Sequence, residues 1–361
     1  MFKSNFMRAA GVPSKKKLSF AVKPPLRMYL RKYTRETSLP VKYGDLMRFD
    51  NTASLIDGHG EDTLWETAYY SESDTKELHE ALTQIYALLK TDGNVEVLEH
   101  LSVARIDWCS FGNTHPFRIR IINRYNDNYD HFYVKKADAS RVYGLELEHI
   151  LSPERITYMV DQETLIEEHI AGIPGDRFVT HNLEVPKFDQ TRISKEFVKF
   201  NERCFVRLLG DMRSYNYVVD VTPDIEGNQY RIRAIDFDQQ SYEGRKSFYL
   251  PQYFKENNPI IKMGMSLMDP DTVTQYQLEE RTLIANRAKA GSERLRMLLD
   301  VMRRDQISSA EKIEKLKMEL TDHHKNDAFS ACKNMGDIVL TNINLITKKV
   351  FTQSMGNSNL L

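Results

Sequence analysis

The chain of 361 residues has only three cysteines, Cys109, Cys204 and Cys332, and they lie far apart in the sequence. Without a C-x-x-C pair, the sequence offers no structural zinc site and no disulfide framework. No apolar run approaches the roughly 18 residues that a membrane span requires, and no secretory apolar segment follows Met1. We therefore expect a soluble cytoplasmic protein of about two or three packed units.

Several catalytic signatures are also missing, namely G-x-S-x-G, H-E-x-x-H and G-x-x-x-x-G-K-[ST]. A Walker-type ATPase is therefore unsupported. The adjacent pair His323-His324 does not replace a metal motif, because neighbouring helical side chains diverge by about 100°.

Acidic residues are absent from residues 1–35, which carry many lysines and arginines. Such a basic arm can bind an anionic partner, either nucleic acid or lipid, or an acidic face of its own protein. A solvated or self-docked terminus is the simpler alternative. Pro13, Pro24 and Pro25 interrupt any amphipathic helix there, which argues against an organellar transit peptide.

Hydrophobic periodicity predicts an α+β chain. We expect two short strands within residues 95–108, and single strands at 117–124, 131–136, 155–160 and 164–170. We expect helices at 74–91, 140–151, 194–209, 273–289, 292–304, 309–322 and 327–348. A capping box formed by Ser308 and Glu311 would start the helix at 309–322. Residues 36–73 cannot be assigned from the pattern.

The segment 209–238 is the most informative part of the chain. Asp211 and Asn216 have the spacing D-x-x-x-x-N, and Asp236 and Asp238 follow the β-like run at 230–235. We expect two strands around a long turn, which would bring these side chains together. Such a set can position a hydroxyl group and hold Mg²⁺ against a triphosphate. The segment therefore predicts phosphoryl transfer from ATP.

The order of elements and motifs over about residues 95–270 resembles the protein-kinase-like superfamily. The resemblance is closest to the small-molecule kinases of the aminoglycoside and choline phosphotransferase type. It implies a bilobal kinase-like fold, with an antiparallel-sheet small lobe and a mainly helical large lobe. The implied ranges are a basic arm at 1–35, an extension at 36–94, the small lobe at 95–170, the large lobe at 171–270, C-terminal helices at 271–350 and a tail at 351–361.

The same resemblance implies roles for the polar residues of the segment 209–238. Asp211 would orient the acceptor hydroxyl and take its proton, and Arg213 would stabilise charge on the transferred phosphate. Asn216 and Asp236 would bind Mg²⁺, with help from Asp238.

In the small lobe, the resemblance implies a lysine that contacts the ATP phosphates and a glutamate that pairs with it. Lys135 and Lys136 point to opposite faces of their strand. We favour Lys136, because it shares a face with Val134, and keep Lys135 as the alternative. For the glutamate we favour Glu146 over Glu148.

The adenine edge would be bound by backbone groups near Glu168, His169 and Ile170, in a segment that resembles the hinge of small-molecule kinases. Only Gly112 is available for a glycine-rich phosphate loop.

We thus expect an ATP- and Mg²⁺-dependent phosphotransferase that acts on a hydroxyl of a small molecule. Leu209 stands where the family has a histidine, and no A-P-E-like segment follows Asp238, which argues against a conventional protein kinase. Two alternatives stay open. One is a kinase-like protein that transfers AMP or is an inactive pseudokinase. The other is a binding or scaffold protein that acts through the arm and the C-terminal helices.

Overall fold

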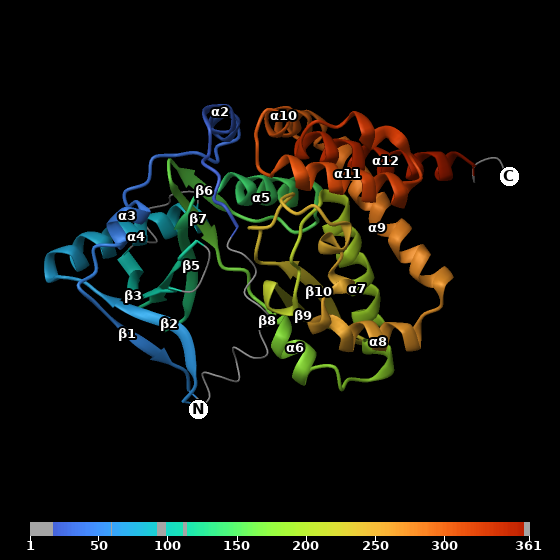
Figure 1. The fold of residues 1–361 in the computed structure, drawn as a ribbon. Coiled ribbons are helices and arrows are strands. Elements are labelled where there is room, and N and C mark those ends of the chain that lie inside the picture. The colour runs from blue at the N-terminus through green and yellow to red at the C-terminus, as the bar shows by residue number, and fades with distance from the viewer. Residues whose placement is uncertain (1–16, 59, 92–98, 111–113, 357–361) are drawn as a thin grey trace. The chain divides into compact units, whose positions relative to one another are not determined.

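The computed structural model describes residues 17–58, 60–91, 99–110 and 114–356 (Figure 1). The chain divides into two compact units, and each unit is discontinuous in sequence. Unit 1 comprises the described residues of Met1–Ala21, Ser38–Asp138 and Asp161–Ile166; unit 2 comprises those of Val22–Thr37, Ala139–Val160 and Glu167–Leu361. The units therefore interleave along the chain, whereas the ranges expected from the sequence are contiguous.

Unit 1 is built on a β-sheet. Its strands are β1 (Asn51–Ile56), β2 (Asp62–Tyr69), β3 (Leu101–Trp108), β4 (Phe117–Asn123) and β5 (Tyr129–Lys136). Each of these strands pairs antiparallel with the next. The whole sheet has seven strands in the order β1-β2-β3-β4-β5-β7-β6, and the division between the units falls within β6 (Tyr158–Asp161) and β7 (Thr164–Glu168).

One face of this sheet is apolar, because alternate residues of its central strands point to the same side. Phe117, Ile119 and Ile121 of β4 are almost fully buried, as are Phe132 and Val134 of β5. The helix α4 (Glu72–Thr91) packs on β3 and β4 and buries Leu78, Leu82 and Ile85. The short helix α3 (Tyr43–Leu46) lies against β5.

Unit 2 is mainly helical. Its second sheet has the order β10-β9-β8, with β8 (Ile173–Pro174), β9 (Tyr217–Asp224) and β10 (Gly227–Ala234). Its helices are α2 (Pro24–Lys32), α5 (Ala139–Leu151), α6 (Gly175–His181), α7 (Lys187–Arg207), α8 (Asn258–Leu267), α9 (Pro270–Ala290), α10 (Ser292–Met302), α11 (Ala310–His324) and α12 (Met335–Gly356). The long helix α7 packs against α8, α9 and α12 and forms the centre of the unit.

Several of the N-terminal basic residues that the structure describes bind carboxylates of the same chain. In unit 1, Lys17 Nζ lies 2.8 Å from Asp138 Oδ1. In unit 2, Lys23 Nζ lies 2.7 Å from Asp305 Oδ1, and Arg27 and Arg31 both bind Glu36. These contacts agree with a self-docked arm over residues 17–35.

Three expectations about local structure need correction. Pro24 and Pro25 do not interrupt a helix but begin α2. In the first helical turn the N–H groups have no acceptor within the helix, so proline, which lacks an N–H, costs no hydrogen bond there. The cap of α11 is Ser309, whose side chain accepts from the N–H of Lys312, and not Ser308. The connection between β9 and β10 is a tight turn, because Asp224 pairs directly with Gly227.

The α+β class is confirmed, and the order of elements from β3 to β10 is consistent with the kinase-like fold that the sequence predicts. No helix within the described residues has the length and apolar character that crossing a membrane requires.

Candidate functional site

The loop that carries Asp211 begins where α7 ends. Leu209 is fully buried and forms an isolated antiparallel bridge with Gln240. The N–H of Gly210 donates to the carbonyl of Gln239 over 3.2 Å. A Cβ atom at Gly210 would lie 2.6 Å from the ring of Phe248, so only glycine fits this approach. The backbone before Asp211 is therefore fixed against the segment that follows Asp238.

Asn216 holds the shape of the loop from its other end. Its side-chain Nδ2 donates to the carbonyl of Asp211 over 2.7 Å, across a short 3₁₀ turn at Ser214–Asn216. The carbonyl of Asn216 accepts from the N–H of Ile235 over 3.0 Å. Asp211 itself has a φ of 61°, in the left-handed region that costs free energy for a residue other than glycine. The loop is thus held by specific contacts in a strained form.

The carboxyl group of Asp211 is the most perturbed acid of the loop. Burial raises its pKa from the usual range to about 6, and the charges of Asp236 and Glu256 act in the same direction. Arg213 opposes the shift, since its Nε donates to Asp211 Oδ1 over 2.9 Å. The other end of this guanidinium binds Glu256, with Nη1 to Oε1 at 2.7 Å. A carboxyl with this pKa is mostly ionised at neutral pH and can accept a proton.

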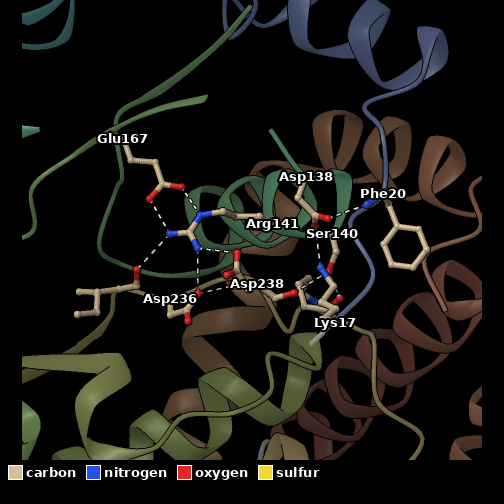
Figure 2. Close-up of polar contacts among 10 residues, drawn as sticks. Lys17, Phe20, Asp138, Ser140, Arg141, Glu167, Asp236 and Asp238 are labelled. Carbon is tan, nitrogen blue, oxygen red and sulfur yellow. Dashed lines mark hydrogen bonds and ion pairs between the residues drawn. The ribbon is translucent and has the colours of Figure 1, made fainter. Parts of the chain in front are cut away.

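The two aspartates of the I-D-F-D segment share a buried arginine (Figure 2). Arg141, in the first turn of α5, places Nη1 at 2.9 Å from Asp236 Oδ1 and at 2.8 Å from Asp238 Oδ1. Its Nη2 donates to Glu167 Oε2 over 2.7 Å, and Nε also binds Glu167. The side chain of Arg141 is only 2% exposed. Charged partners on three sides thus fix the guanidinium, and it in turn fixes both aspartates.

The expected metal ligands Asn216, Asp236 and Asp238 offer oxygen atoms, which is the donor type that Mg²⁺ prefers. No group of three or more His, Cys, Asp or Glu residues within the described part of the chain is arranged to hold a metal ion. These three side chains therefore supply the type of donor atom that Mg²⁺ requires. A metal that binds Asp236 would share this carboxylate with the guanidinium of Arg141.

The two lysines of β5 differ strongly in exposure. Lys135 is 8% exposed, and its Nζ lies 5.2 Å from the ring centre of Tyr133. Lys136 is exposed at the end of the strand, 5.4 Å from the ring centre of Tyr43. The structure therefore places the two candidates in different surroundings, and the phosphate-binding role stays a prediction for both.

Glu146 and Glu148 of α5 each have buried partners within unit 2. Tyr29 and Tyr158 donate to the two oxygens of Glu146 over 2.6 Å, and Arg294 binds both oxygens over 2.8 Å. Glu148 forms an ion pair with Arg207 of α7. Glu146 thus lies at the meeting point of α2, α5, β6 and α10, and the structure gives its carboxylate a set of partners that the sequence did not predict.

The expected hinge residues follow β7. Glu168 exchanges two hydrogen bonds with Thr157: its N–H donates over 3.1 Å, and its Oε1 accepts over 2.7 Å. His169 is half-buried and Ile170 is buried. Backbone recognition of adenine at these residues stays a prediction. Gly112, the expected phosphate-loop glycine, lies outside the described residues.

The sequence did not predict the roles of Arg141, Ser140 and Gln240, whose side chains hold the segments that carry the candidate site residues. Ser140 Oγ donates to the carbonyl of Gln240 over 2.7 Å, and Gln240 Nε2 donates to the carbonyl of Leu208 over 3.3 Å. These contacts hold the loop at Leu209, the position for which the sequence resemblance implies a histidine. A lone arginine in the first turn of a helix has no sequence signature. The two closely spaced carboxylates of D-F-D were the available hint that a cation was needed.

Comparisons with known proteins add little to this geometry. No protein-family model matches the sequence, and no curated protein matches it. Among solved structures, the chain is similar to the PAN3 pseudokinase of Neurospora crassa, with a TM-score of 0.21 and 8% sequence identity. The match covers 78% of this chain and 71% of that chain. A TM-score this low supports no inference by itself, so a functional assignment depends on the contacts of this chain.

Proposed function

We propose that the protein is a kinase-like phosphotransferase that moves the terminal phosphoryl group of ATP to a hydroxyl of a small molecule, with Mg²⁺. The observation that supports this most directly is Asp211. It is a partly buried acid with a pKa of about 6, its backbone is held by Asn216, and it feels the charge of Asp236. This is the arrangement that a base needs when it acts beside a metal-binding carboxylate.

In the proposed reaction, Asp211 accepts a hydrogen bond from the acceptor hydroxyl and takes its proton. The hydroxyl oxygen forms a bond to the γ-phosphorus, the bond from this phosphorus to the bridging oxygen breaks, and ADP leaves. Asp236 and Asn216 are the residues that would hold Mg²⁺, which offsets the negative charge of the phosphates. Arg213 adds positive charge next to Asp211 and keeps the pKa of that acid from rising further.

A second candidate is a kinase-like protein that binds nucleotide without transferring phosphate. Two observations favour it. Arg141 binds both Asp236 and Asp238, and the buried Leu209 takes the place of the family histidine. Transfer of AMP is a third outcome of the same site. A scaffold role through the basic arm is less favoured, since the described lysines and arginines contacting Asp138, Asp305 and Glu36 are already paired.

The test compares wild-type protein with Asp211→Ala and Asp236→Ala, and uses Asp224→Ala as the matched control. Asp224 is an exposed carboxylate at the far end of the same hairpin. The measurements are the shift in melting temperature with millimolar MgATP and the mass added to candidate acceptors. Phosphate and AMP add different masses, so the two kinds of transfer are distinguishable.

We expect Asp236→Ala to lose both the MgATP-dependent shift and transfer. Asp211→Ala should keep the shift and lose transfer by about 100-fold or more, while Asp224→Ala should behave as wild type. Transfer that survives in both Asp211→Ala and Asp236→Ala would overturn the mechanism. A shift without transfer in the wild type would select the second candidate, and no shift at all would exclude both.

A further inference from the structure

Arg141 makes a contact of a kind that a metal ion usually makes. A single nitrogen, Nη1, lies within hydrogen-bond distance of one oxygen from each of two carboxylates, at 2.9 Å from Asp236 and at 2.8 Å from Asp238 (Figure 2). Joining two carboxylates through one positive centre is what a bound divalent cation does. The N–H of Asp238 also donates to Asp236 Oδ1 over 3.0 Å, so the two residues form one rigid group.

The charge of this arginine is permanent. A guanidinium stays protonated in proteins, and this one lies among the carboxylates of Glu167, Asp236 and Asp238. The guanidinium is also held in orientation, because Glu167 binds it through both carboxylate oxygens and the carbonyl of Ile235 accepts from Nη2 over 3.4 Å. An arginine fixed in this way does not leave its site when pH or salt changes within the physiological range.

The two aspartates differ in their access to solvent. The side chain of Asp236 is 34% exposed, whereas that of Asp238 is 10% exposed. A metal ion that arrives from solvent therefore meets Asp236, with a positive guanidinium directly behind the carboxylate. Repulsion between the two cations weakens the binding of that metal.

We infer that Arg141 is a positioning residue that acts as the resident cation of the Asp236–Asp238 pair. It sets the geometry of both carboxylates before any metal binds. It also keeps the affinity of the nucleotide-free protein for divalent cations low. A metal ion therefore binds only together with the nucleotide phosphates, whose negative charge offsets the charge of the ion. This inference rests on the proposed function in one respect, which is that it assigns a metal to Asp236.

The test measures Mn²⁺ binding to the full-length protein in the absence of nucleotide and acceptor, by calorimetric titration and by the spin resonance signal of free Mn²⁺. The main variant combines Arg141→Met with Glu167→Gln. It removes the cation and also the negative charge of Glu167, which binds that cation through both carboxylate oxygens. The variant therefore does not keep a buried Glu167 carboxylate after its cation is gone. We expect this variant to bind Mn²⁺ at least tenfold more tightly than wild type, because two carboxylates then have no guanidinium between them.

Two further variants separate charge from general disturbance. Arg141→Lys keeps the positive charge. Because the expected gain in Mn²⁺ affinity comes from the loss of that charge, this variant should bind Mn²⁺ within about threefold of wild type. The matched control combines Arg207→Met with Glu148→Gln. This is another buried arginine–glutamate pair made by α5, and its removal should leave Mn²⁺ binding unchanged.

The inference is overturned if the double variant, shown to melt cooperatively, binds Mn²⁺ no more tightly than wild type. It is equally overturned if Arg141→Lys gains tenfold, because charge would then not be the cause. Should the double variant fail to fold, Arg141→Gln is judged by the same tenfold criterion. The proposed phosphotransfer fails on a different readout: absence of an MgATP-dependent melting shift would reject it and leave the Mn²⁺ result standing.

Discussion

Two buried ion clusters lie on the single helix α5, and their charges are reversed. Arg141 is a cation among three carboxylates, Glu167, Asp236 and Asp238. Glu146 is a carboxylate among the hydroxyls of two tyrosines and the guanidinium of Arg294. Both central side chains are almost fully buried. Because burial of an isolated charge is costly, each cluster exists only through its partners.

The partners show what each cluster connects. Those of Arg141 come from β7 and from the segment after β10, which belong to the candidate site. Those of Glu146 come from α2 and α10, which lie outside the part of the chain that resembles kinases, and from β6. The helix α5 thus fastens the candidate site to the N-terminal and C-terminal helices of unit 2. This gives those helices a positioning role that the sequence motifs did not suggest.

Breaking the Glu146 cluster should have the largest effect. Burial alone would raise the pKa of Glu146, but Arg294 and the two tyrosine hydroxyls hold it below its usual value. Replacing Glu146 with Ala leaves a buried guanidinium and two buried hydroxyls without their acceptor. We expect a loss of about 3–5 kcal/mol in the free energy of unfolding, measured by urea denaturation.

The matched control for this change is Glu154→Ala. Glu154 pairs with Arg231, whose side chain is 52% exposed, so its loss should cost less than about 1 kcal/mol. Equal losses for the two variants would mean that Glu146 has no special role in joining α2, α5 and α10.

Breaking the Arg141 cluster should destabilise the protein in a way that depends on pH. Arg141→Met leaves three carboxylates without their cation, at a cost of about 3 kcal/mol near pH 7. Their pKa values in the folded state then rise above the unfolded values, so the folded state binds more protons. The lost stability should therefore return in part as the pH is lowered from 7 to 5.

The Glu146→Ala variant should show no such recovery in acid, because the groups left unpaired there are arginines and tyrosines that do not titrate in this range. Urea midpoints measured at several pH values test both variants together. Parallel pH profiles for Arg141→Met and Glu146→Ala would contradict the reversed charge pattern.

A smaller effect is expected at Asp211, whose pKa is raised in part by the charge of Asp236, a partner of Arg141. Arg213 lowers the pKa of Asp211 by a hydrogen bond and by its charge. Removing it in Arg213→Gln should raise that pKa from about 6 by roughly one unit. A titration of carboxyl carbon signals by NMR measures the shift without any need for turnover. The ionised form needed as a base would then be reached only at higher pH.

The smallest effect concerns His149, next to the Glu146 cluster. Burial, together with the charges of Arg35, Arg294 and Arg155, lowers its pKa to about 4 against the opposing charge of Glu146. The unfolded chain takes up this proton near pH 6.5, so stability should fall as the pH drops from 6.5 to 4.

His149→Asn should remove that slope, by less than about 1 kcal/mol because the ring is partly exposed. An unchanged slope between wild type and His149→Asn, measured by thermal melting at each pH, would assign the acid sensitivity to other groups.

The sequence predicts the fold where one face of an element is regularly apolar. The alternation in β4 and the helical stripe of α4 were readable because Ile119 and Ile121, or Leu78 and Leu82, recur at a fixed period. The strands β1 and β2 were not predicted, since β1 is mostly exposed and shows no alternation. The helix α2 was missed because its prolines suggest an interruption, whereas at the first turn they favour a helix.

The candidate site was predictable only for those residues that form a motif of recognisable spacing in the sequence. Asp211, Asn216 and Asp236 lie within one short stretch of sequence, and the structure ties Asn216 to Asp211 and to the end of β10. Arg141 could not be found in this way. Its partners lie far from it in the sequence, and a contact between distant residues produces no periodic sequence pattern. The partners of Glu146 were hidden for the same reason, since Tyr29 and Arg294 belong to elements that no motif connects.

The meeting of α2, α5 and α10 at Glu146 also has a consequence for how the chain acquires its structure. Tyr29 is synthesised early and Arg294 late, yet both must be present before Glu146 is fully bonded. Unit 2 therefore closes a very long loop, and such closures slow folding. During synthesis, α2 lacks its packing against α10 until α10 has left the ribosome. A chain truncated after residue 290 should accordingly lose protease resistance throughout unit 2 and not only at its new end.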